Sequence, residues 1–289
     1  MNDLLMTELE EVHDLPALIN AGADIFLIAL DGYSFTAQRK MKIEQVSFVK
    51  DMAQGFGKSV ALLVNKLFHE GEVTKLDALF ETIRDVQYII FQDPAVIMKA
   101  KQYGYGGKLI YMPDTLVTNR QDAEFYRQQG IMPSVSPVLI KEEVMGIVED
   151  GEAMVTVFGH TILSRSARHL LSAWSAHYEK ESLVKKEGLV LVEEKRNGRM
   201  PVYEDEEGTC IYSDEVLMAC AEMQEIHTEH SLIYFVDGVF LERMAHIDGV
   251  HAVKEAMDGK DGTEVENAYR EKYPSLQLGK GYSYAKTIL

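Results

Sequence analysis

Polar side chains that could bind a substrate or transfer a proton recur directly after short apolar runs of this sequence. In a parallel β/α barrel the loops that follow the strands gather at one end, so such residues meet there. We therefore expect a polar mouth, with Asp93 and His160 as candidate catalytic groups. The candidate substrate-binding groups are Asn65, Gln92, Asp114, Asn119, Arg165, Arg168, His169 and Asp237.

Several of these residues also have a purely structural interpretation. Asp93 precedes Pro94 and could cap the next helix, since proline favours the first helical position. Asn119 could satisfy the free amides of another helix in the same way. Arg165 and Arg168 are three residues apart, so on one helix they could clamp a carboxylate or phosphate, or pair with surface carboxylates.

The histidines do not favour a metal site. His160 and His169 are nine residues apart, which places them more than two turns apart on one helix. A zinc ion needs ligand nitrogens at about 2 Å, so this pair could not share one. We expect no metal and no cofactor.

The elements that must position these residues follow a β/α rhythm up to about residue 160. Seven strands are expected at Leu4–Met6, Ile25–Leu30, Ser59–Val64, Tyr88–Phe91, Lys108–Tyr111, Ser134–Val135 and Met154–Phe158. Helices are expected between them at Leu15–Ala21, Ile43–Gly55, Thr74–Ile83, Ala95–Tyr103, Arg120–Gln129 and Lys141–Val148. This uninterrupted alternation predicts a TIM-like (β/α)8 barrel.

The rhythm changes after Phe158. The pattern predicts a helix over His160–Tyr178, a hairpin of Leu189–Glu194 and Met200–Glu204 around the turn Arg196–Arg199, and a strand at Thr209–Tyr212. The last barrel unit follows, with Asp214–Ile226 as a helix capped by Ser213, Ser231–Val236 as the eighth strand, and Gly238–Met257 as its helix. Residues 1–258 thus form the barrel, residues 179–213 are an inserted hairpin region before the last unit, and residues 259–289 are a tail that packs on the barrel or on a partner.

Composition limits the classes of partner. The 289-residue chain has a formal charge of −17, which opposes broad contact with phosphate backbones because each such contact needs a Lys or Arg. Its apolar runs are far too short to cross a bilayer, and we expect a cytoplasmic protein without membrane contact. Only Cys210 and Cys220 occur, at a spacing that fits neither a disulfide framework nor a paired metal-ligand motif.

Several segments, in order along the chain, resemble the collagenase-like peptidase family U32. In the first half these are Ala21–Ile25 (AGADI), Gly57–Asn65, Ile89–Ala95 (IIFQDPA) and Val117–Asn119. In the second half, Val157–His160, Ser166–Ser172 and Pro201–Ile211 occupy the positions of further family motifs. The resemblance covers about residues 2–255 and implies the family's barrel.

The departures from the family concern cysteine. Relatives that carry an iron–sulfur cluster have cysteines where this chain has Ile162 and His169, and a further pair in the region of residues 182–193, where this chain has none. Thiolates hold such clusters, so the resemblance implies a barrel that forms no cluster.

The resemblance leaves three functions open. The first is an accessory, non-catalytic subunit that supports a cysteine-bearing U32 paralogue in prephenate-dependent hydroxylation of the tRNA wobble uridine, reaching tRNA through that partner. The second is a peptidase or other hydrolase, although Ser164, Ser166 and His160 stand in no serine-hydrolase motif. The third is a barrel that binds a small anionic metabolite between Arg165 and Arg168.

Overall fold

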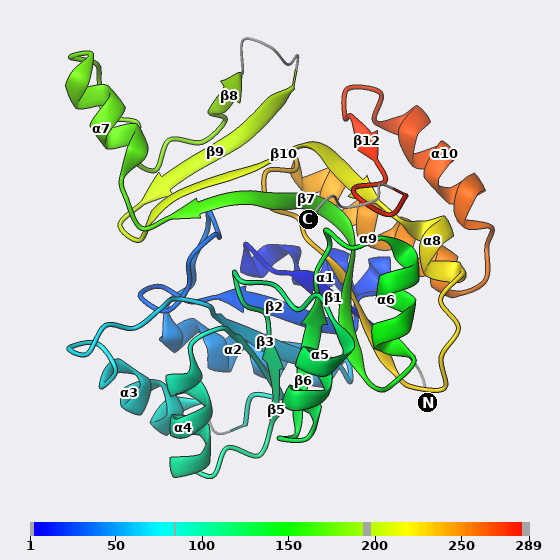
Figure 1. The fold of residues 1–289 in the computed structure, drawn as a ribbon, viewed down its shortest axis with the longest axis horizontal. Coiled ribbons are helices and arrows are strands. Elements are labelled where there is room, and N and C mark those ends of the chain that lie inside the picture. Colours follow the sequence, from blue (N-terminus) through cyan, green and yellow to red (C-terminus); the bar gives the residue numbers. More distant parts are fainter. Residues whose placement is uncertain (1–2, 84, 193–197, 285–289) are drawn as a thin grey trace.

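Eight parallel strands close into a barrel in the computed structural model, which describes residues 3–83, 85–192 and 198–284 (Figure 1). The strands follow the order β11-β1-β2-β3-β4-β5-β6-β7, and β7 also pairs with β11 to complete the ring. They are β1 (Leu4–Glu8), β2 (Ile25–Ala29), β3 (Ser59–Val64), β4 (Tyr88–Phe91), β5 (Lys108–Tyr111), β6 (Ile131–Val135), β7 (Ala153–Ser166) and β11 (Leu232–Val236). The predicted TIM-like barrel is confirmed.

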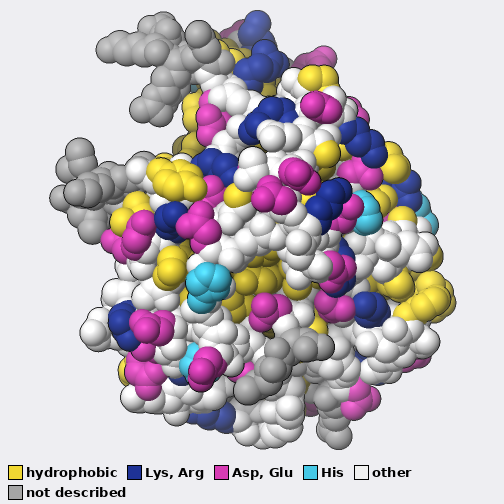
Figure 2. All heavy atoms as spheres, turned by 90° about the vertical axis from the view of Figure 1, so that its right-hand side faces the viewer, with side chains coloured by type: hydrophobic (Ala, Val, Ile, Leu, Met, Phe, Trp, Pro, Cys, Tyr) yellow, Lys and Arg dark blue, Asp and Glu magenta, His cyan; other side chains and the backbone are white. Residues whose placement is uncertain are grey.

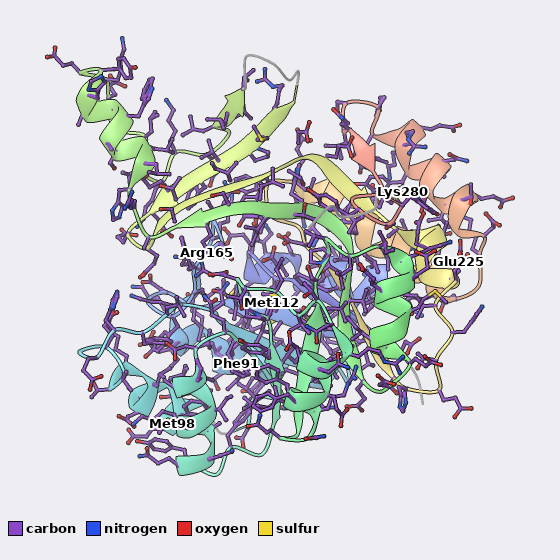
Figure 3. The ribbon with its side chains drawn as sticks, in the orientation of Figure 1. Phe91, Met98, Met112, Arg165, Glu225 and Lys280 are labelled. Atoms are coloured by element: carbon purple, nitrogen blue, oxygen red, sulfur yellow. The ribbon has the colours of Figure 1, made fainter. Side chains whose placement is uncertain are left out.

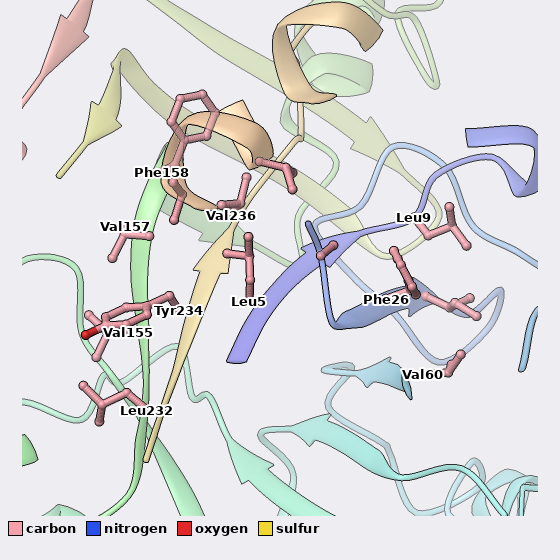
Figure 4. Close-up of a cluster of buried hydrophobic side chains, with 14 of the residues drawn as sticks. Leu5, Leu9, Phe26, Val60, Val155, Val157, Phe158, Leu232, Tyr234 and Val236 are labelled. Atoms are coloured by element: carbon pink, nitrogen blue, oxygen red, sulfur yellow. The ribbon is translucent and has the colours of Figure 1, made fainter. Parts of the chain in front are cut away.

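Barrel strands are buried on both faces, which explains their nearly continuous apolar sequences. All five residues of β2 are buried. Alternate residues such as Leu27, Leu63 and Phe235 fill the interior of the barrel. The residues between them, including Leu5, Phe26 and Tyr234, point outward into the layer under the helices (Figure 4).

Helices cover the outside of the barrel. They are α1 (Leu15–Ala21), which follows the 3-10 turn η1 (Val12–Asp14), then α2 (Ile43–Gly55), α3 (Lys75–Thr82), α4 (Pro94–Gln102), α5 (Arg120–Arg127), α6 (Lys141–Val148), α8 (Cys220–Gln224) and α9 (Arg243–Met257). The six helices expected before residue 150 are present, with ends that differ by at most two residues. Gly22 ends α1 at a φ of +105°, a conformation that glycine adopts without steric cost.

The helix predicted over His160–Tyr178 is wrong. Strand β7 instead continues to Ser166 and pairs antiparallel with β10 (Gly208–Met218), with Phe158 opposite Met218 and Ser166 opposite Thr209. Only Leu170–His177 forms a helix, α7. The β-branched and apolar residues Thr161–Leu163 suit a strand, and pairing with a segment about 50 residues away decides the outcome.

The helix predicted over Asp214–Ile226 is also largely wrong. Strand β10 runs through Met218, and α8 covers only Cys220–Gln224. Ser213 caps no helix: its hydroxyl accepts a hydrogen bond from the backbone amide of Thr161 and donates one to the carbonyl of Glu215. Ser213 therefore joins β10 to the extended end of β7.

An arm projects from the barrel between β7 and α8 (Figure 1). It consists of α7, the short strand β8 (Val190–Val192), β9 (Arg199–Asp205) and the first part of β10. Strand β9 pairs antiparallel with both β8 and β10. Part of the predicted hairpin, Glu193–Glu194 and the turn residues Arg196–Asn197, lies outside the described residues.

The C-terminal segment lies on the barrel beside α8 and α9 (Figure 1). It contains α10 (Gly262–Lys272) and β12 (Leu278–Gly279), and β12 pairs with β10. The Lys280 ammonium forms ion pairs with the buried carboxylates of Glu222 and Glu266, at 2.7 and 2.6 Å. On the face shown in Figure 2, acidic and basic side chains are interspersed with hydrophobic ones. None of the helices in the described part of the chain is long and apolar enough to cross a membrane.

Candidate functional site

A cavity of about 410 Å³ opens at the carboxyl ends of the barrel strands. Its floor is the top layer of the barrel interior, formed by Leu27, Leu63, Met112 and Phe235. The extended end of β7 and part of β10 form one side, and Figure 3 shows Arg165 and Met112 in this region. Of the sequence-predicted site residues, Asn65, Asp114, His160, Arg165 and Asp237 line this cavity.

Arg165 is held in a network on one wall of the cavity. Its guanidinium pairs with the carboxylate of Asp114 at 2.5 Å and donates to the backbone carbonyl of Asn65 at 2.9 Å. It also lies 4.0 Å from the ring centre of Phe35, within cation–π range. The Gln92 side chain joins the same network, donating to the Asn65 carbonyl and accepting from the Asp114 amide. The positive charge of Arg165 is thus already neutralised.

Arg168 and His169 lie elsewhere. Arg165 belongs to β7, whereas Arg168 follows the end of that strand, so the predicted helix face that carries both arginines is wrong. Arg168 and His169 are exposed and do not line the mouth cavity. The ring Nε2 of His169 lies 3.3 Å from the carbonyl oxygen of Glu206 on the arm. Nothing in this geometry supports an anion clamp between the two arginines.

His160 lies on β7 at the side of the cavity and is buried. Its Nδ1 is 2.7 Å from the carbonyl oxygen of Ser213, which can only accept, so Nδ1 carries a proton. Burial lowers the pKa of His160, which favours the neutral ring. In that tautomer Nε2 is an acceptor and could receive a proton from a ligand.

Asp93 and Asn119 cap helices, as their alternative interpretation predicts. The Asp93 carboxylate accepts from the amides of Ala95, in α4, and Phe68, both at 2.8 Å. The Asn119 side chain accepts from the Asp122 amide at 2.9 Å, at the start of α5. Neither residue lines the cavity. A catalytic role for Asp93 stays a prediction without geometric support.

Glu8 is a cavity residue that the sequence prediction missed. It ends β1, and Asp237 directly follows the neighbouring strand β11, so their side chains meet at the mouth. Burial and the nearby Asp237 carboxyl raise the pKa of Glu8 well above its usual value. Burial also raises the pKa of Asp237 to about 6. The predicted strand ended at Met6, two residues early, so Glu8 was assigned to a loop although "TELEE" carries the charge that could have revealed it.

The residues present do not fit an iron–sulfur cluster. Cys210 and Cys220 are buried in two separate hydrophobic clusters, and burial raises the pKa of each thiol to about 12. Such thiols stay protonated, whereas cluster ligands are thiolates. Residues 3–83, 85–192 and 198–284 hold no group of three or more His, Cys, Asp or Glu side chains placed to hold a metal ion.

The model of peptidase family U32 matches residues 10–285. The chain therefore belongs to this family. It is 28% identical to the tRNA hydroxylation protein P2 of Bacillus subtilis (strain 168), over 99% of this chain and 98% of that protein. The structure of the U32 peptidase Mk0906 matches with a TM-score of 0.50 at 17% identity and covers 81% of this chain and 92% of that one, which shows a shared fold.

Proposed function

We propose that this U32 protein is an accessory, cluster-free subunit in tRNA hydroxylation, acting with a cysteine-bearing paralogue on the wobble uridine. The observation that carries the proposal is the end-to-end match to a tRNA hydroxylation protein, over 99% of this chain and 98% of that one. Because the match leaves almost no part of either chain uncovered, it extends beyond the shared barrel core.

The cysteine positions support an accessory role. The two thiols of this chain are buried and separate, and position 162, which is cysteine in cluster-bearing relatives, holds an isoleucine that lines the mouth cavity. A chain that lacks the thiolates for a cluster requires another subunit to supply the redox centre. In the proposal the paralogue holds that centre and this barrel contributes binding surface.

Exposed apolar side chains on the arm support a subunit role as well. Leu170 and Trp174 on α7 and Tyr178 directly after it are between 43 and 56% exposed, and Val192 on β8 is 58% exposed. Large apolar groups that gather on one projecting element are typical of protein interaction sites. An arm of this kind gives the paralogue a surface to bind apart from the mouth of the barrel.

The first test removes the gene from its native host and measures hydroxylated wobble uridine by mass spectrometry of digested tRNA. We expect the modified nucleoside to fall to a small fraction of its level, and expression of the intact chain to restore it. A variant with Cys210 and Cys220 both changed to alanine should restore it equally well, because neither thiol takes part. Normal nucleoside levels in the deletion strain would refute the proposal.

The second test uses affinity purification from the native host. Trp174→Asp places a charge on the exposed face of α7, and we expect it to reduce recovery of the cysteine-bearing paralogue about tenfold or more, as at a central interface aromatic. Phe125→Asp is the matched control, because Phe125 is 60% exposed on α5, away from the arm. Equal recovery with both variants would contradict a role of the arm in this contact.

A further inference from the structure

Glu8, which is buried, and Asp237, which is partly buried, form a carboxyl pair at the edge of the mouth cavity. Thr7 pairs with Val236 across β1 and β11, so the next residue of each chain segment, Glu8 and Asp237, emerges beside the other. Glu8 is only 8% exposed, and its Oε2 atom accepts no hydrogen bond from the residues that the structure describes. Asp237 accepts a hydrogen bond from the amide of Val239 at 2.9 Å.

No cation in the described ranges compensates this pair. Neither carboxyl forms an ion pair with a Lys or Arg of residues 3–83, 85–192 or 198–284. Arg165, the cavity arginine, is paired with Asp114 on the opposite wall, and Arg39 is paired with Glu11 outside the cavity. A buried carboxylate without a partner is costly, so the pair is a site that favours a positively charged ligand.

The titratable groups around the pair are mostly acidic. Arg39 lines a neighbouring pocket together with Glu8, but its guanidinium pairs with Glu10 and Glu11. His246, which contacts Thr7, is neutral because burial lowers its pKa to about 4. Glu10, on the loop after β1, adds negative charge, and burial raises the pKa of this carboxyl to about 7. Tyr212, on β10, is fully buried, and burial raises the pKa of its phenol well above the usual value. The negative charge of Glu187, which precedes β8, also raises the pKa of Glu10. Near neutral pH the pair therefore shares one proton and carries about one negative charge.

The rest of the cavity defines the body of the ligand. Beside the pair lie the apolar side chains of Leu27, Phe235 and Val239. The volume of about 410 Å³ is within the range of small-molecule sites, and its apolar floor is suited to a hydrocarbon or aromatic body. A ligand with a positively charged head group and an apolar body therefore matches the cavity, whose lining is acidic at the carboxyl pair and apolar beside it.

We infer that the mouth cavity binds a small primary amine, with its ammonium group between Glu8 and Asp237 and its apolar body against Leu27 and Phe235. Carboxylates and phosphates are disfavoured as ligands, because Asp114 neutralises Arg165 and the head-group site is acidic. This site goes beyond the proposed role in tRNA hydroxylation and does not depend on it.

The test uses probes that share a body and differ in the head group. Propyl, benzyl and hydroxyphenylethyl bodies are each offered to the purified chain as the amine, the alcohol and the carboxylate, and binding is measured by thermal shift and calorimetry. We expect at least one amine to bind, its alcohol more weakly, and its carboxylate not at all. A series in which no amine binds, or in which a carboxylate binds best, would overturn the inference.

The pH dependence provides a second readout. Below a pH of about 6 the pair holds a second proton, which an ammonium group must displace, so affinity should rise with pH up to the pKa of about 6 of Asp237 and level off above it, where only the shared proton remains. One released proton changes the affinity by about tenfold between roughly pH 5 and pH 7.5. An affinity that is independent of pH would mean that the amine binds elsewhere.

Two nearly isosteric variants locate the site. Glu8→Gln and Asp237→Asn each replace one carboxyl of the pair by a neutral amide, which cannot share the proton and brings an NH2 donor next to the ammonium group, so each should lower amine affinity about tenfold or more. Glu124→Gln is the matched control, because Glu124 is exposed on α5 and does not line the mouth cavity. Unchanged affinity in both Glu8→Gln and Asp237→Asn would refute the site, while normal tRNA modification in the deletion strain would bear only on the proposed function.

Discussion

Glu204 has no exposed surface, yet it is a carboxylate that the structure uses to hold the arm together. Its oxygens accept hydrogen bonds from the amides of Leu171 and Ser172 at the start of α7, and from the hydroxyls of Ser172 and Thr209. Burial acts to raise the pKa of Glu204, but these hydrogen bonds outweigh it and the pKa is lowered. A single side chain thus joins α7 to the β9–β10 hairpin.

Glu204→Gln tests this joint. The amide places a donor where the carboxylate accepts, so we expect a loss of about 1–3 kcal/mol in the free energy of unfolding near neutral pH, measured with urea. Because the folded-state pKa is lowered, the carboxylate's contribution is present above its unfolded-state pKa of about 4.3 and is lost as pH falls through the folded value. The difference between the two proteins should therefore shrink below about pH 4.

Glu206→Gln is the control for this experiment. Glu206 lies on the same hairpin, but its ion pair with Lys185 is exposed, and such pairs contribute little. A change within about 0.5 kcal/mol is expected. If both variants lost the same amount, the hydrogen bonds of Glu204 would not be the cause.

Among the elements, β7 departs most from a standard barrel strand. It contributes Ala153–Phe158 to the ring and then continues into the antiparallel sheet with β10. Gly159 lies where the strand passes from the ring into the antiparallel sheet, and its φ is +121°. A Cβ atom at this position would lie 2.4 Å from the carbonyl oxygen of Asp237. The strand can leave the barrel at this point only because residue 159 has no side chain.

Gly159→Ala should destabilise the protein strongly. The methyl group must displace the backbone beside Asp237 and the backbone must keep a strained φ, so we expect a loss of more than about 2 kcal/mol. Gly55→Ala, at the end of α2, is the matched control, because a Cβ there meets nothing within 4 Å. Alanine at position 55 should be neutral or stabilising by up to about 1 kcal/mol. Thermal unfolding of the two variants distinguishes a steric cause from a general effect of losing glycine.

On the scale of the whole molecule, helix α10 of the C-terminal segment packs against the outside of the barrel as part of its helical layer. Val265 and Tyr269 of α10 are 1% and 4% exposed, and the Tyr269 ring meets Phe158 of β7 edge to face. The Tyr269 hydroxyl donates to the Ala245 carbonyl in α9. The helix therefore stabilises the region where the barrel strand β7 meets α9.

Tyr269→Ala tests whether α10 unfolds together with the barrel. Loss of the ring and its hydrogen bond should cost about 3–5 kcal/mol, and the protein should still unfold in a single transition followed by circular dichroism and intrinsic fluorescence. Arg270→Ala, an exposed neighbour on the same helix, should leave the transition unchanged. A separate early transition in Tyr269→Ala would show that α10 is an independent unit.

The sequence by itself determined the barrel, because its strands are buried on both faces and its helices alternate with them at a regular interval. The caps at Asp93 and Asn119 and the positions of Asn65, His160 and Asp237 near the mouth were predictable for local reasons, because each follows the barrel part of a strand or directly precedes a helix. The tertiary structure alone decided three features. Residues 160–166 and 213–218 became strands through long-range pairing, Glu8 met Asp237 because the ring closes between β1 and β11, and Asp114 neutralised Arg165. Each depends on contacts between segments far apart in the chain, which local periodicity does not contain.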